Sequence, residues 1–136
     1  MNIRTVAQAL SACLLFSLSL TTQAESDKVF ELRTYTTHEG RLPALHERFE
    51  NHTIELFEKH GMHSVGYWVP SDPERADNTL IYILEHKSRE AAAQSWQAFG
   101  EDPDWQKVHK ESREDGAIVK HIDSVFMTAT EYSAIQ

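Results

Sequence analysis

The sequence predicts an α+β fold in which a four-stranded antiparallel sheet carries its helices on one face. Strand-like and helix-like segments alternate in the order β-α-β-β-α-β, which is the order of the ferredoxin-like fold. The chain has 136 residues, so it has room for one domain and not for two full cores. Its 40% of hydrophobic and 10% of aromatic residues are sufficient for one core and argue against disorder.

The first half of the domain predicts one strand and one long helix. Residues 29–36 are rich in aromatic and β-branched residues and partly alternate, as strands do. Residues 41–60 repeat apolar side chains at helical spacing, with Pro43 in the first turn and Gly61 just past the end. The apolar positions of this helix are Leu42, Leu45, Phe49, Leu56 and Phe57.

The next part of the chain predicts two strands and a helix. Residues 63–69 form a strand that ends at Pro70, and residues 80–84 form a strand that is apolar on both faces. Ser88 is placed to cap a helix over residues 89–99.

The second helix is expected in two pieces, followed by the last strand. Gly100 is expected to interrupt it, and Asp102 caps a second piece that runs to about Arg113. Residues 118–128 then form the fourth strand.

Residues 1–24 predict a secretory signal peptide. Arg4 is the only charge in this segment, residues 6–20 are apolar or small, and Ala24 offers a small residue at the cleavage site. The apolar run is shorter than the roughly 20 residues of a membrane span, although an uncleaved anchor is the alternative. We therefore expect a single domain over residues 25–136, periplasmic or secreted, without stable insertion into the membrane. Cleavage would also remove the only cysteine, Cys13.

The charge of the chain excludes one class of partner. The formal net charge is −8, and no run of Lys or Arg interrupts it. Nucleic-acid-binding modules normally carry a basic patch, so we expect no nucleic acid partner.

The first strand carries the candidate site. Glu31, Arg33 and Tyr35 share one face because alternate residues of a strand point the same way. The alternate residues Phe30, Leu32 and Thr34 share the other face. We expect this more apolar face to meet the helices and the Glu-Arg-Tyr face to point away from them.

Two interpretations of Glu31, Arg33 and Tyr35 stay open. In the structural one, Glu31 and Arg33 form a buried ion pair capped by the Tyr35 hydroxyl. In the functional one, Arg33 and Tyr35 hold an anionic or carbonyl-bearing ligand between aromatic walls from Trp68 or Tyr82.

Several segments resemble the NIPSNAP family. They are Glu31-Leu32-Arg33-Thr34-Tyr35, Ser95-Trp96-Gln97-Ala98-Phe99 and Asp102-Pro103-Asp104-Trp105-Gln106. The resemblance covers about residues 29–133. It implies a dimeric α+β barrel, in which two ferredoxin-like sheets pack face to face, and it implies little about activity.

The residues themselves also predict a homodimer. Two helices can cover only one face of the sheet, yet residues 80–84 are apolar on both faces. A second copy placed on the uncovered face would remove a large apolar patch.

Metal and cofactor sites are not expected. The chain has eight histidines, but none falls in a recognised metal-ligand spacing. His109 is considered as an axial haem ligand, against the plainer interpretation of an exposed helical histidine. We therefore expect no metal and no cofactor.

Three functions remain after these exclusions. The favoured one is small-molecule binding in the interior of a dimeric barrel, either as a binding protein or as a cofactor-independent enzyme. The alternatives are a non-catalytic interaction module and a haem-associated barrel protein.

Overall fold

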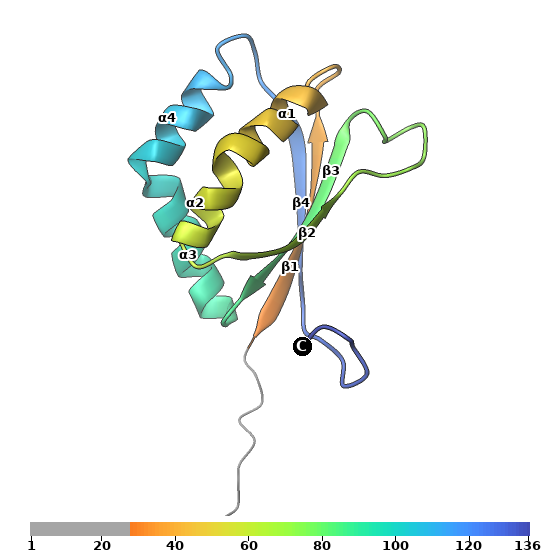
Figure 1. The fold of residues 1–136 in the computed structure, drawn as a ribbon, viewed down its shortest axis with the longest axis vertical. Coiled ribbons are helices and arrows are strands. Elements are labelled where there is room, and N and C mark those ends of the chain that lie inside the picture. Colours follow the sequence, from red (N-terminus) through yellow and green to blue (C-terminus); the bar gives the residue numbers. More distant parts are fainter. Residues whose placement is uncertain (1–27) are drawn as a thin grey trace, which may run out of the picture.

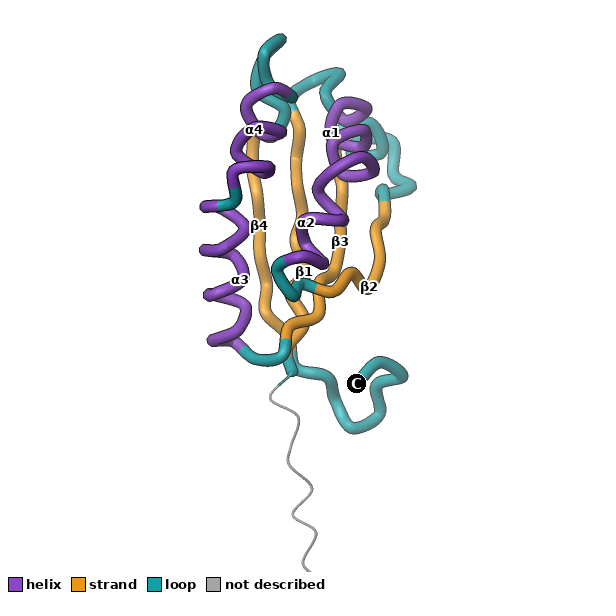
Figure 2. The backbone as a smooth tube through the Cα atoms, turned by 60° about the vertical axis from the view of Figure 1, so that its left-hand side comes forward, coloured by secondary structure: helices purple, strands orange, loops and turns teal. Residues whose placement is uncertain are grey.

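A computed structural model describes residues 28–136 (Figure 1). The predicted signal peptide, residues 1–24, and its predicted cleavage site lie outside the described residues. The expected α+β fold is confirmed: four antiparallel strands lie in the order β2-β3-β1-β4, with the helices on one face (Figures 1 and 2). Among residues 28–136, no helix is long and apolar enough to cross a membrane.

The sheet is built around its two central strands, β1 (Val29–Thr37) and β3 (Thr79–His86). They pair from Val29↔His86 to Thr36↔Thr79. The edge strands are β2 (His63–Trp68) and β4 (Val119–Met127), each with one irregularity in its register. Most of β4 is exposed, as an edge strand without a partner on its free side would be.

The predicted first helix contains a π-helical turn that the sequence analysis did not anticipate. It divides into α1 (Leu42–Arg48), the π turn η1 (Phe49–Thr53) and α2 (Ile54–Lys59). In the π turn, the backbone N–H of Ile54 donates to the carbonyl of Phe49, five residues back. The Thr53 hydroxyl donates to the Arg48 carbonyl over 3.1 Å. Such single turns inside α-helices are frequent at functional sites.

The second helix breaks two residues later than expected. Gly100 lies inside α3 (Arg89–Glu101), and the break comes at Asp102, whose side chain accepts from the Asp104 backbone N–H to cap α4 (Pro103–Glu111). Ser88 caps α3 as predicted, by accepting from the Ala91 N–H. The break occurs at Asp102 because its extended backbone, and not Gly100, ends the hydrogen-bonded helix.

The face assignment of β1 was wrong. The Glu31-Arg33-Tyr35 face packs beneath the helices: Glu31 accepts a hydrogen bond from Trp96 of α3, and Tyr35 contacts the ring of Phe49. The core lies between this face and the helices; it is formed by Tyr35, Leu42, Leu45, Phe49, Leu56, Phe57, Met62, Leu80, Tyr82, Leu84, Phe99 and Ile118.

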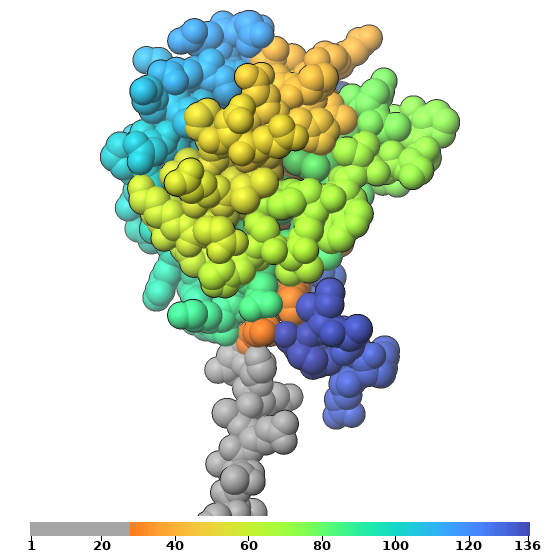
Figure 3. Space-filling view, in the orientation of Figure 1, coloured from red at the N-terminus to blue at the C-terminus, as the bar shows by residue number. Residues whose placement is uncertain are grey.

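The opposite face of the sheet has no layer of helices over it, and we call it the open sheet face. Leu32 lies on it between its register partners Ile83 and Val125, and Trp68 lies opposite Ile81. Val125 is 54% exposed and Trp68 is 49% exposed. At one end of this face, the segment after β4 lies near Phe30 and protrudes beside the domain (dark blue in Figure 3).

Candidate functional site

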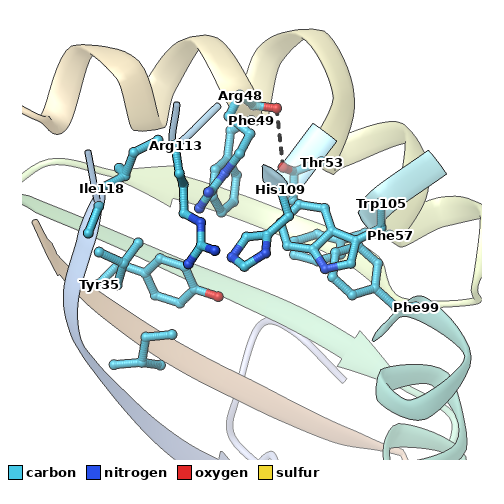
Figure 4. A pocket seen from close by; sticks show the side chains of 13 residues that line it. Tyr35, Arg48, Phe49, Thr53, Phe57, Phe99, Trp105, His109, Arg113 and Ile118 are labelled. Carbon is cyan, nitrogen blue, oxygen red and sulfur yellow. Dashed lines mark hydrogen bonds between the residues drawn. The ribbon is translucent and has the colours of Figure 1, made fainter. Parts of the chain in front are cut away.

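A small cavity lies between the sheet and the helices, close to the end of β1 and the start of β4. Its volume is about 120 Å³. Its walls come from β1, β4, α1, the π turn, α2, α3, α4, and the segment that leads from α4 into β4 (Figure 4). The lining residues are Tyr35, Arg48, Phe49, Thr53, Phe57, Phe99, Trp105, His109, Arg113, Ala117, Ile118, Val119 and Ile122.

The cavity has a basic wall formed by Arg48, His109 and Arg113. Arg48 is 5% exposed, and its Nε has no hydrogen-bond partner among the described residues. Its Nη1 donates only to the Ser112 hydroxyl, over a long 3.4 Å. Figure 4 shows Arg113 and His109 pointing into the same space as the Tyr35 hydroxyl.

The basic wall combines the buried Arg48 with the exposed Arg113, and no carboxylate of the described residues pairs with either. None of the ion pairs formed within residues 28–136 involves Arg48 or Arg113. Burial and the nearby charge of Arg113 lower the pKa of Arg48 below that of a free guanidinium. Burial, Arg113 and Arg48 also lower the pKa of His109, which favours its neutral form.

The remaining walls are largely aromatic. The His109 ring stacks on Trp105, with 5.2 Å between the centroids. Arg48 lies over the same indole, 5.4 Å from its centroid. Tyr35 meets the edge of Phe49 at 6.0 Å. Polar groups thus converge on an otherwise apolar space, as they do in most small-molecule sites.

The π turn places three of these side chains. Arg48 immediately precedes the turn, Phe49 begins it and Thr53 ends it, and all three line the cavity. Sequence reasoning missed Arg48 and Arg113. The sequence did contain a signal for Arg48. This charged residue lies three positions after the apolar Leu45 and immediately before Phe49, which places it beside the apolar side of the helix.

The predicted site residues divide between the cavity and a separate network. Tyr35 lines the cavity, whereas Glu31 and Arg33 do not. Arg33 donates to Glu31 over 2.8 Å, so the expected ion pair is present. The Arg33 guanidinium also lies 4.2 Å from the centroid of Trp96.

Glu31 is 1% exposed and accepts further hydrogen bonds from Trp96 and Ser124 at 2.7 Å each and from His86 at 3.0 Å. Burial raises the pKa of this carboxyl, but the hydrogen bonds and the Arg33 charge outweigh burial and lower the pKa to about 2. Glu31 therefore stays ionised inside the protein.

Trp68 and Tyr82 do not form aromatic walls around Arg33 and Tyr35. Tyr82 is fully buried beneath the helices and stacks on Tyr67, its register partner in β2. Trp68 follows Tyr67 in the strand and therefore lies on the open sheet face. The two proposed aromatic walls lie on opposite sides of the sheet.

Two other histidines near helix ends take carboxylate partners. His60 pairs with Asp102 and His63 pairs with Glu58, each at 2.7 Å. In the part of the chain that the structure describes, no three His, Cys, Asp or Glu side chains gather as a metal site would need.

Residues 30–134 match the NIPSNAP family model. The chain belongs to the NIPSNAP family. The resemblance found in the sequence is thereby confirmed over nearly the whole described domain.

Solved structures share the fold of this NIPSNAP domain. A NIPSNAP family protein of unknown function from Agrobacterium tumefaciens is 22% identical with a TM-score of 0.69, over 80% of this chain and 94% of that one. A NIPSNAP-like domain protein from Burkholderia xenovorans is 14% identical with a TM-score of 0.69, over 80% and 90%. No curated protein sequence matches significantly.

An enzyme has the same fold at a greater distance. SnoaB, a cofactor-independent oxygenase from Streptomyces nogalater, is 15% identical with a TM-score of 0.55, over 81% of this chain and 99% of that one.

Proposed function

We propose that this NIPSNAP protein binds a small molecule in the cavity between its sheet and its helices. One observation carries the proposal: the buried Arg48 lines the cavity with an Nε that has no partner among residues 28–136. A buried polar group without a partner is costly, and a ligand that accepts its hydrogen bond would remove the cost. This location differs from the barrel interior expected from the sequence, because the Glu-Arg-Tyr face packs beneath the helices.

The fold is compatible with such a role. SnoaB is described as a cofactor-independent oxygenase, so a domain of this architecture can act on a small molecule.

A pair of matched substitutions tests the proposal. Ala117 lines the cavity and is exposed, so Ala117→Trp fills the space with little cost to the fold. Ala98 is exposed on α3 and is not among the lining residues, so Ala98→Trp is the control. A panel of small neutral and charged aromatic compounds is screened by ligand-observed NMR. We expect compounds that bind the unsubstituted protein and A98W but not A117W; binding that A117W leaves unchanged throughout would contradict the proposal.

We also propose that the protein is exported. The support is the change in composition at Ala24, from an apolar segment with one charge to a strongly charged chain. Intact mass of the protein recovered from the periplasm or medium should correspond to a chain that starts at or within two residues of Glu25. A mass that retains residues 1–24 would contradict export by cleavage.

A further inference from the structure

We infer that the ligand of this cavity is an aromatic anion, whose negative group is held by Arg48 and Arg113. The inference rests on the proposed small-molecule function and adds the chemical class of the ligand. It starts from the charge that the cavity wall leaves unbalanced.

Three other arginines of the domain have acidic partners close by, whereas the exposed Arg89 forms no ion pair within residues 28–136 and lies over the ring of Phe126. Arg33 pairs with Glu31 and Arg41 pairs with Asp115 at 2.8 Å each, and Arg75 pairs with Asp72 at 3.1 Å. Arg48 and Arg113 take no such partner within the described domain, although the chain has 21 acidic residues and a net charge of −8. Arg48 is nevertheless one of the buried charged residues.

Burying an unpaired guanidinium is unfavourable for folding. The helices above Arg48 and the sheet below it remove its guanidinium from water. The lowered pKa of Arg48 reflects that burial. A negative group bound in the cavity would supply the missing charge. Arginine suits this purpose because its planar group donates two parallel hydrogen bonds to a carboxylate.

The geometry places the second cation beside the first. Arg48 lies at the end of α1 and Arg113 follows α4, so the two helices bring them to one cavity. The Tyr35 hydroxyl and the His109 ring face the same space in Figure 4 and add polar contacts around it.

The other walls select a flat, apolar body. Trp105, Phe49 and Tyr35 present rings to the cavity, and its volume of about 120 Å³ suits a single small ring system. Offset or edge-on contacts between aromatic rings are favourable. An aromatic carboxylate satisfies both the basic and the aromatic walls, whereas inorganic phosphate satisfies only the basic one.

The test uses benzoate, its neutral analogue benzyl alcohol, and inorganic phosphate as probes. Each is titrated by calorimetry into the unsubstituted protein, Arg48→Met, Arg113→Gln and the control Arg75→Gln, whose side chain is exposed and paired with Asp72. We expect benzoate to bind the protein and R75Q, and to bind R48M and R113Q about 10- to 100-fold more weakly, the usual effect of losing a charge-assisted hydrogen bond. Benzyl alcohol and phosphate should bind much more weakly than benzoate.

Thermal unfolding without ligand provides a second measurement on the same variants. If Arg48 is retained for a ligand and not for stability, R48M should melt at the same or a higher temperature. A lower melting temperature with benzoate affinity unchanged would overturn the inference.

The other outcomes separate this inference from the proposed function. If benzyl alcohol bound as tightly as benzoate and A117W abolished that binding, the ligand would not need a negative charge. The inference would then be overturned, while the cavity would remain a binding site. Phosphate binding as tightly as benzoate would overturn the aromatic class. If no compound of the wider panel bound in an A117W-sensitive manner, the proposed function itself would fail.

Discussion

Glu31 is buried as a carboxylate because four side chains donate to it: Arg33, His86, Trp96 and Ser124. They come from its own strand, from both neighbouring strands and from α3. The network therefore ties α3 to the middle of the sheet. It is a structural feature next to the cavity and not part of its lining.

The network predicts that stability depends on pH through Glu31. Its pKa falls from 4.5 to about 2 on folding, and each unit corresponds to about 1.4 kcal/mol, so ionised Glu31 contributes about 3 kcal/mol at neutral pH. Because the folded pKa is the lower one, this contribution is present above pH 4.5 and is lost as the pH falls toward 2. Glu31→Gln should therefore cost about 3 kcal/mol at pH 7 and progressively less below pH 4.5.

Urea unfolding at several pH values measures this difference. Glu55→Gln is the matched control, because Glu55 is exposed on α2. If E31Q destabilised the protein equally from pH 7 to pH 3, the ionised form of Glu31 would not be the source of its contribution to stability.

The π turn links the fold of the first helix to the cavity. The hydrogen bond from the Thr53 hydroxyl to the Arg48 carbonyl spans the turn and is buried. Thr53→Val keeps the shape of the side chain but removes this donor, so we expect a loss of about 1 kcal/mol. Chemical denaturation measures it, with the exposed Thr128→Val as control. Equal stability of T53V and the unsubstituted protein would mean that the turn does not depend on this bond.

The helices and strands were predictable to the extent that local patterns determine them. The alternation of side chains predicted β1, and the capping residue Ser88 predicted the start of α3. The π turn left no local signal, because Phe49 continues the apolar spacing of the helix across it. Asp102 was predictable as the cap of α4 but not as the place where α3 ends, because the glycine at Gly100 lies inside α3 without interrupting it.

The candidate site was predictable only in part, for a related reason. Alternation shows that Glu31, Arg33 and Tyr35 share a face, but it does not show which face is covered. The partners that make burial of Glu31 favourable, His86, Trp96 and Ser124, lie 55 to 93 residues away in the sequence. Arg48 and Arg113 meet only through the packing of α1 beside the end of α4.

At the level of the whole molecule, the open sheet face needs an explanation. Leu32, Ile83 and Val125 form a row across β3, β1 and β4, and Val125 is more than half exposed. Soluble proteins seldom leave a contiguous apolar face uncovered. We propose that a second copy of the chain covers it by a two-fold arrangement.

Sedimentation equilibrium tests this proposal. The unsubstituted protein should have twice the mass of one chain, and Val125→Lys should shift it to a monomer with its secondary structure intact. Ala98→Lys, on the exposed side of α3, should remain a dimer. A monomer at micromolar concentration for the unsubstituted protein would contradict the proposal.

The cavity combines three features of the protein. They are the arginines without ion-pair partners in the described domain, the π turn that positions Arg48, and the sheet that closes the space beneath. A crystal structure of the protein grown with benzoate is the decisive measurement for the cavity. We predict density for the carboxylate within hydrogen-bond distance of Arg48 and Arg113, with the ring beside Trp105. Benzoate found only on the open sheet face, with water filling the cavity, would contradict it.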